Sequence, residues 1–241
     1  MTKPRRGITA TGLKWVAIFA MLVDHVAWKA SLPQGAEFSA HLVGRMAMPI
    51  MCFLVAEGYR HSRDRARYAR RLIAFGVISQ AAFNYYWSGD PTRMAVGPES
   101  VNVIFDLLLG LCALWAIRSG LGAAAKTALV ALCLVGAAAC DWFLFGPLWV
   151  LAFGLSNQFK RQAVWFAAVS AAMVATGLAL SGDLLRLWNF GVFAVLPLLA
   201  AYNGDRSPAG APGWLTNKWL FYVFYPAHLA VIGFVFHQVW G

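Results

Sequence analysis

Charged residues are scarce in this sequence. Of its 241 residues, 12% are Asp, Glu, Lys or Arg, whereas soluble globular domains carry about 25%. Hydrophobic residues account for 60% of the chain, and the mean hydropathy is +0.61. The shortage of charge excludes an ordinary soluble domain. It predicts an all-α, polytopic membrane helix bundle that forms one domain over residues 1–241.

The chain also lacks the spacings that mark metal sites and common nucleophiles. Its four cysteines stand singly in apolar runs without a Cys-x-x-Cys pair, so we interpret them as small core residues. No grouping of His, Cys and Asp has metal-ligand spacing, and there is no Gly-rich phosphate loop or Gly-x-Ser-x-Gly turn. No internal repeat is visible, which disfavours a transporter built from inverted repeats. We therefore expect no metal site and no serine hydrolase.

What the sequence has instead is a series of apolar segments separated by short gaps. We identify nine, at about residues 13–30, 43–60, 70–87, 101–118, 123–140, 142–157, 162–180, 187–203 and 219–239. A membrane-spanning helix needs about 20 apolar residues. The pattern therefore predicts about nine transmembrane helices, and the short gaps leave no room for a separate soluble domain.

The net charge of +10 comes largely from bases placed in alternate gaps. The N-terminal arm and the even-numbered gaps hold most of them: Lys3, Arg5, Arg6 and Lys14, then Arg60, Arg63, Arg65, Arg67, Arg70 and Arg71, then Arg118, Lys126, Lys160, Arg161, Arg206 and Lys218. Cytoplasmic loops of membrane proteins are enriched in Lys and Arg. We therefore expect a cytoplasmic N-terminus, an external C-terminus, the lipid bilayer as a partner and no nucleic acid.

Two ionisable residues, Asp24 and His25, lie inside the first apolar segment. An aspartate near the centre of a membrane helix costs about 2.5–3.5 kcal/mol on insertion scales, and ionisable residues at such depth are usually functional. Lys14 precedes His25 by eleven residues, a spacing that puts both on one helix face and about 16 Å apart along its axis. Asp24 faces away from His25, so any imidazole that it orients is reached through another helix or a water.

The second apolar segment offers a partner for Asp24. Arg45 begins this segment, at the depth that Asp24 reaches in an antiparallel hairpin, and a contact between the two would offset the burial of both. At the other end of the segment, Glu57 stands three and four residues before Arg60 and His61. This group is either a snorkelling ion cluster at the interface or part of a binding site.

The basic loop over residues 63–71 also has two interpretations. It is either a topology signal that contacts anionic lipid headgroups, or a cradle for the phosphates of a cosubstrate, in which Arg70 and Arg71 take part.

Further polar residues recur at helical spacing in the outer halves of later segments. Amides often serve only to join helices, but together these side chains predict one polar cavity that opens outward. Its expected members are Asp24, His25, Arg45, Gln80, Asn84, Asn102 and Asp106. In the last segment Pro226 frees a backbone carbonyl, and Tyr225 and His228 are spaced to face a cavity.

Several stretches of the sequence resemble the TraX family: Leu13-Lys14-Trp15, Asp24-His25, Gly44-Arg45-Met46-Ala47-Met48-Pro49, Ala56-Glu57-Gly58, Arg71-Leu72 to Ser79-Gln80, Asn102-Val103-Ile104-Phe105 and Phe224-Tyr225-Pro226-Ala227-His228. TraX proteins are multi-pass proteins of the bacterial inner (plasma) membrane, and the named member acetylates the N-terminal amine of a conjugative pilin. The resemblance implies an acetyl-CoA-dependent N-acetyltransferase, with a pilin or another extracytoplasmic acceptor as its partner.

The spacing from Lys14 to His25 is also similar to an Arg-to-His spacing in the first helix of acyltransferase family three. Members of that family move acyl groups from cytoplasmic acyl-CoA to acceptors outside. Here Lys14 supplies a point charge in place of a bidentate guanidinium.

The residues thus allow acyl transfer across the membrane, with His25 as general base because its ordinary pKa of about 6.5 suits that role. Arg45, Asn102 or Tyr225 would donate to the oxyanion, and His228 is the second candidate base. The candidate catalytic residues are His25, Asp24, Arg45, Asn102, Tyr225 and His228, and the candidate acetyl-CoA-binding residues are Lys14, Glu57, Arg60, Arg70 and Arg71. Direct transfer and an acyl-histidine intermediate both remain open.

Two other classes of function remain open at this stage. A proton-coupled transporter would use Asp24, His25 and Asp106 as a relay. A non-catalytic pilus-assembly protein would use its buried polar groups only to join helices.

Overall fold

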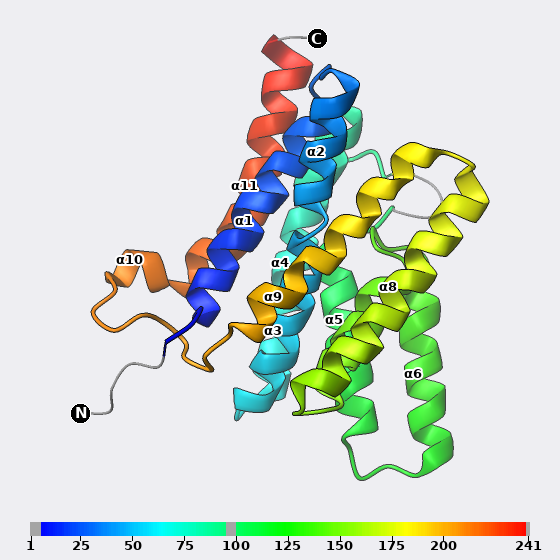
Figure 1. Ribbon diagram of the computed structural model, residues 1–241, viewed down its shortest axis with the longest axis vertical. Coiled ribbons are helices and arrows are strands. Elements are labelled where there is room, and N and C mark those ends of the chain that lie inside the picture. Colours follow the sequence, from blue (N-terminus) through cyan, green and yellow to red (C-terminus); the bar gives the residue numbers. More distant parts are fainter. Residues whose placement is uncertain (1–5, 95–99, 240–241) are drawn as a thin grey trace. The chain divides into compact units, whose positions relative to one another are not determined.

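The computed structural model describes residues 6–94 and 100–239, apart from the side chain of Lys218. The predictions made for Lys3 and Arg5 therefore lie outside the described residues. The described chain is a series of helices joined by short loops (Figure 1). The described residues contain two isolated β-bridges, Ile8 with Tyr202 and Val101 with Cys140, and they form no β-strand. The all-α prediction is confirmed.

The helices follow the predicted apolar segments closely. In chain order they are α1 (Ala10–Ala27), α2 (Gln34–Gly44), α3 (Ala47–His61), α4 (Arg65–Ser88), α5 (Val103–Ile117), α6 (Ala123–Ala137), α7 (Phe145–Gly154), α8 (Phe159–Ser181), the 3₁₀ helix η1 (Leu184–Ala194), α9 (Val195–Ala200), α10 (Gly213–Thr216), α11 (Lys218–Phe234) and the π-helical turn η2 (Val235–Val239). Each of the nine apolar segments overlaps at least one of these helices, and the segments 43–60, 187–203 and 219–239 overlap two each.

Only some of these helices have the length of a full membrane span. Within the described residues, four helical segments are long and apolar enough to cross a bilayer: Ala10–Ala27, Gln34–His61, Phe159–Ser181 and Trp219–Val239. Shorter apolar helices lie between them, and α7, with 10 residues, is about 15 Å long against a hydrocarbon core of about 30 Å. The protein is a multi-pass membrane protein, while the number of nine spans stays a prediction.

The helix α2 was not predicted. Pro33 stands at its N-cap, where its fixed φ suits the start of a helix. Its sequence includes Gln34, Glu37, Ser39 and His41, and this polar content hides the helix from a search for apolar segments.

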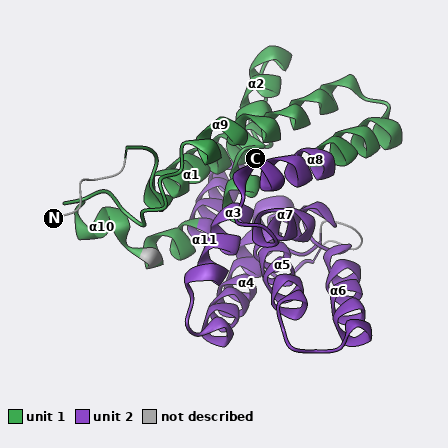
Figure 2. Cartoon of the chain, turned by 60° about the horizontal axis from the view of Figure 1, so that its bottom comes forward, with its two compact units in different colours: residues 1–51, 170–224 green, residues 52–169, 225–241 purple. Residues whose placement is uncertain are grey.

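The chain forms two compact units (Figure 2). Unit 1 comprises residues 1–51 and 170–224, and unit 2 comprises residues 52–169 and 225–241. The chain passes from one unit to the other within α3, α8 and α11. The single domain over 1–241 stays a prediction.

Unit 1 is built on the hairpin of α1 and α2. The two helices approach so closely at Gly44 that a Cβ there would lie 2.3 Å from Asp24. On its other side α2 packs against η1, where a Cβ on Gly191 would lie 1.9 Å from the carbonyl oxygen of Leu42. At the opposite end of α1, Thr11 bonds to the backbone of Arg206 through both its amide and its hydroxyl. Gly44 and Gly191 thus let α1, α2 and η1 pack closely at the end of α1 that carries Asp24.

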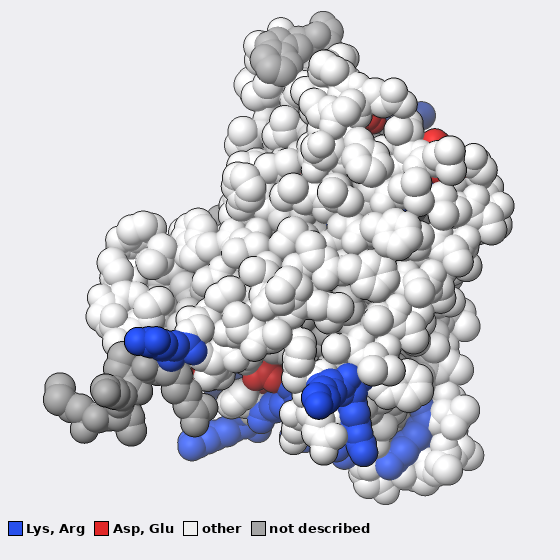
Figure 3. Space-filling view, in the orientation of Figure 1, with Lys and Arg blue, Asp and Glu red and all other residues white. Residues whose placement is uncertain are grey.

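Unit 2 is organised around α5, which packs against α4, α6 and α7. Gly110 and Gly154 permit the close approach of α5 and α7, because a Cβ on either would lie within 3 Å of a side chain on the other helix. Aromatic residues fill the core beside them, and the fully buried rings of Phe153 and Phe166 stack at 5.2 Å. Figure 3 shows uncharged residues over the middle of one face, as expected of a lipid-facing surface, and Lys and Arg side chains gathered along its lower edge.

Candidate functional site

Asp24 is the centre of a buried charged cluster in unit 1. Nη2 of Arg45 donates to both carboxylate oxygens of Asp24, at 3.1 and 3.0 Å. Nδ1 of His41 donates to Oδ1 at 2.9 Å. The predicted contact between Asp24 and Arg45 is confirmed, and the antiparallel hairpin of α1 and α2 brings it about.

His41 is not among the site residues predicted from the sequence. A signal was present, because His41 and Arg45 are four residues apart and so share one face of a helix. The residue is completely buried, and its ring packs against the indoles of Trp28 and Trp188, with centroid distances of 4.4 and 4.6 Å. The two indoles also meet each other edge to face, with centroids 5.9 Å apart. In the described part of the chain, its Nε2 atom is buried and has no hydrogen-bond partner.

His25 points in a different direction from Asp24, as its position in the helix predicts. Its Nδ1 lies 2.8 Å from the carbonyl oxygen of Met21, one turn earlier in α1. A carbonyl oxygen only accepts hydrogen bonds, so this contact places a proton on Nδ1. In the neutral ring Nε2 is then the atom that can take a proton.

Lys14 stands on α1 near the opposite end from His25. Its ammonium lies over the ring of Phe221, 4.8 Å from the centroid, which is within the range of a cation–π contact. The indole of Trp15 donates to the carbonyl oxygen of Leu215 beside it. The first helix therefore carries a cation at one end and an imidazole toward the other, both within unit 1.

The predicted amide residues form a closed network in unit 2. Asn102 is the N-cap of α5, and its Nδ2 donates to the carbonyl of Gly76 at 2.9 Å and to Oε1 of Gln80 at 2.7 Å. Gln80 in turn donates to Asn84 and to the carbonyl of Ser100. Both amide hydrogens of Asn102 thus have acceptors already, and in this arrangement the side chain joins α4 to α5.

Asp106 is completely buried in the same part of unit 2. Its Oδ2 accepts from the backbone amide of Trp142 at 3.1 Å, and Oδ1 has no hydrogen-bond partner among the described residues. Tyr225 and His228, both buried, lie in α11 with ring centroids 5.6 Å apart. Tyr225 is close enough to Asp106 for an electrostatic interaction.

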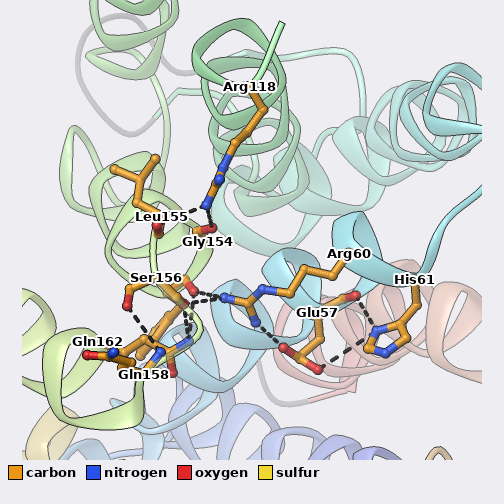
Figure 4. A network of polar contacts seen from close by, with 10 residues as sticks. Glu57, Arg60, His61, Arg118, Gly154, Leu155, Ser156, Gln158 and Gln162 are labelled. Atoms are coloured by element: carbon orange, nitrogen blue, oxygen red, sulfur yellow. Dashed lines mark hydrogen bonds and ion pairs between the residues drawn. The ribbon is translucent and has the colours of Figure 1, made fainter.

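At the basic end of unit 2, Arg60 joins α3 to the end of α7 and the loop that follows it (Figure 4). Its guanidinium donates to the carboxylate of Glu57 and to the carbonyl oxygens of Phe153 and Ser156. The carboxyl terminus of a helix leaves its last carbonyls without partners, and Arg60 supplies donors to those of α7. The predicted pair of Glu57 and Arg60 is confirmed.

A second arginine acts at the same place. Nη2 of Arg118 donates to the carbonyls of Gly154 and Leu155, at 3.2 and 2.9 Å (Figure 4). Among the other predicted phosphate ligands, Arg71 lies over the ring of Tyr68 at 5.6 Å, and Arg70 is exposed. Arg60 is thus engaged by protein groups, whereas Arg70 is open to solvent.

The fold and these clusters define a helical multi-pass membrane protein with buried charges and imidazoles. The family model described as TraX protein matches residues 10–236. The chain belongs to the TraX family, which confirms the resemblance noted in the sequence.

Two relatives give the extent of the similarity. The chain is 30% identical to the probable fimbrial assembly protein FimC, serogroup H1, of Dichelobacter nodosus, over 93% of this chain and 94% of that protein. It is 29% identical to Protein TraX of Escherichia coli, over 92% of this chain and 84% of that protein. No solved structure matches the chain.

Proposed function

We propose that this protein is a pilus-related acetyltransferase of the bacterial inner membrane. It would move an acetyl group from cytoplasmic acetyl-CoA to an extracytoplasmic acceptor, the N-terminal amine of a pilin. Membership of the TraX family and the name of the fimbrial assembly relative support the pilus connection. The observation that carries the chemistry is the placement of Lys14 and His25 toward opposite ends of α1.

In this proposal the cosubstrate lies along α1. The axial distance from Lys14 to His25, about 16 Å, is comparable with the length of an extended pantetheine arm. Lys14 would attract the phosphates of acetyl-CoA from the cytoplasmic side, and the thioester would reach His25. On the sequence pattern, Arg70 and Arg71 are further proposed ligands of the phosphates, whereas Arg60 and Glu57 bond to each other.

His25 would act as the general base. The hydrogen bond to the carbonyl of Met21 keeps a proton on Nδ1, so Nε2 would take a proton from the acceptor nitrogen as it attacks the thioester carbonyl. The C–N bond forms, the C–S bond breaks, and the sulfur of CoA leaves with the proton that His25 returns. Of the oxyanion donors that the sequence suggests, the Asn102 amide and Nη2 of Arg45 are engaged by protein groups, and Tyr225 stays a candidate.

The test is turnover of labelled acetyl-CoA by the purified protein in lipid nanodiscs, with a peptide that carries the pilin-type free N-terminus. We expect release of CoA and acetylation of the peptide in equal amounts, both of them lost when the N-terminus is blocked. A folded protein that consumes no acyl-CoA would overturn the proposal. Proton flux without acyl-CoA consumption would favour the proton-coupled transporter instead.

A further inference from the structure

The proposed reaction on an amine has two protons to remove, and His25 accounts for one of them. An α-amino group has an ordinary pKa of about 7.7–8.0, so at pH 7 it is mostly an ammonium ion without a nucleophilic lone pair. One proton must leave before the nitrogen attacks the thioester, and another must leave as the amide forms. A hydroxyl acceptor would have only one proton to lose.

His41 has the geometry of an oriented base. The carboxylate of Asp24 accepts from Nδ1 at 2.9 Å, which fixes the tautomer and leaves Nε2 as the proton acceptor. Such a carboxylate also stabilises the imidazolium that forms when Nε2 takes a proton. Among the described residues no group bonds to Nε2, although it is buried. A buried acceptor atom without a partner costs free energy, and a ligand N–H would satisfy it.

Aromatic and charged groups surround His41. Charged or titratable groups face it from two helices, namely Asp24 and His25 from α1 and Arg45 at the end of α2, while η1 contributes the indole of Trp188. The indoles of Trp28 and Trp188 pack against His41 and meet each other edge to face, and an indole ring attracts an ammonium placed over its face. Trp28 is 37% exposed, whereas Trp188 is 5% exposed and His41 is completely buried, so Trp28 is the member of this aromatic group that lies nearest the surface.

We propose that His41, held by Asp24, binds the protonated acceptor amine and takes its first proton. This inference rests on the proposed function and names the acceptor as a primary amine in its ammonium form. The ammonium N–H donates to Nε2 of His41 and its proton moves there, which leaves the free amine. The amine attacks the thioester carbon, the C–S bond breaks, and the second proton passes through His25 to the sulfur of CoA. The proton on His41 is released to water, so one proton is released for each acetyl group transferred.

The variant His41→Asn removes the proposed base and keeps the structural hydrogen bond to Asp24. The Asn side-chain amide can still donate to Asp24, as Nδ1 does, but offers no basic nitrogen in place of Nε2. With an amine pKa of about 8, about one-tenth of the acceptor is unprotonated at pH 7. We therefore expect kcat/KM at pH 7 to fall about tenfold, and to recover at pH 9, where the acceptor is already deprotonated.

A second acceptor makes the test independent of pH. The same peptide ending in an aminooxy group, which is unprotonated at neutral pH, should react equally well with wild-type protein and His41→Asn at pH 7. His25→Ala should lose activity with both acceptors and at both pH values. Ser39→Ala, on an exposed position of the same helix, should match wild type throughout, and thermal unfolding of each variant checks the fold.

Each outcome decides the matter. Equal losses for His41→Asn with both acceptors and at both pH values would reduce His41 to a structural residue, and unchanged activity at pH 7 would remove it from the reaction. In both cases the acetyltransferase proposal stands. No turnover by folded wild-type protein with either acceptor would overturn the proposed function, and the role of His41 with it.

Discussion

Nδ1 of His41 lies 2.9 Å from Oδ1 of Asp24, although 17 positions separate the two residues in the chain. The neighbour of Asp24 in sequence, His25, bonds instead to the backbone of its own helix. Two adjacent residues of α1 thus have different hydrogen-bond partners, although both lie within electrostatic reach of His41. Asp24 ties α1 to α2, and His25 presents a second imidazole on a different face.

Asp24→Asn should destabilise the protein strongly. The change leaves the guanidinium of Arg45 buried without its countercharge, and breaking one side of a buried ion pair typically costs about 3–5 kcal/mol. The measurement is thermal unfolding in detergent, with Glu37→Gln on α2 as the matched loss of an acid. Equal unfolding temperatures for Asp24→Asn and wild type would show that the cluster does not hold the hairpin.

Gly44→Ala should destabilise the same hairpin by a different cause. The added Cβ would lie 2.3 Å from atoms of Asp24, and overpacking of this kind costs about 1–3 kcal/mol. Gly35→Ala, on the same helix with no atom within 4 Å of its Cβ, is the control and should be neutral or slightly stabilising. Similar stabilities for both variants would contradict the close approach.

His25→Ala should lower kcat for acetyl-CoA turnover by about 10²–10⁴-fold, the usual contribution of a general base. Binding of acetyl-CoA should change little, because Lys14 lies about three turns away. Turnover and acetyl-CoA affinity are measured side by side. A near wild-type rate would place the base elsewhere, with His228 as the next candidate.

Arg60→Gln and Arg70→Gln should have different effects, the first on stability and the second on KM for acetyl-CoA. Arg70 is exposed, so its loss should raise KM for acetyl-CoA, and more so at low salt, where charges are less screened. Arg60 bonds to two carbonyls at the end of α7, so its loss should lower stability as well. If Arg70→Gln leaves KM unchanged at every ionic strength, the basic loop is a topology signal only.

The orientation in the membrane is tested by thiol labelling. The native cysteines are buried or half-buried, so they should give little background. A membrane-impermeant maleimide should label Ser31→Cys in intact spheroplasts and Gly120→Cys only after permeabilisation. The reverse pattern would place the N-terminus outside.

The sequence was sufficient for the features that depend on local pattern. Apolar runs predict the helices, and spacings of three or four residues predict the pair of Glu57 and Arg60. The contact of Asp24 with Arg45 could be predicted because, in an antiparallel hairpin, the two residues reach the same depth in the membrane. Helix α2 and the role of His41 were not predicted, because polar residues interrupt any apolar run in this stretch of the sequence.

Long-range contacts were beyond the sequence for a physical reason. The carbonyls bound by Arg60 lie 93 and 96 positions away, and a backbone acceptor has no signature in the residue type. The same holds for Asn102, because its side-chain amide could serve equally well as an oxyanion donor or as a helix cap. Only the packing of α4 on α5 decides which acceptors its amide meets.

The short helix α7 has a consequence for biogenesis. Ten residues are too few to enter a bilayer as an independent span, since about 20 are needed. Both arginines that bind its last carbonyls, Arg60 and Arg118, precede it in the chain. During synthesis from the N-terminus the donors are therefore in place before the acceptors emerge. We expect α7 to leave the translocon only against α3 and α5 already inserted, so that the order of translation itself helps this helix to fold.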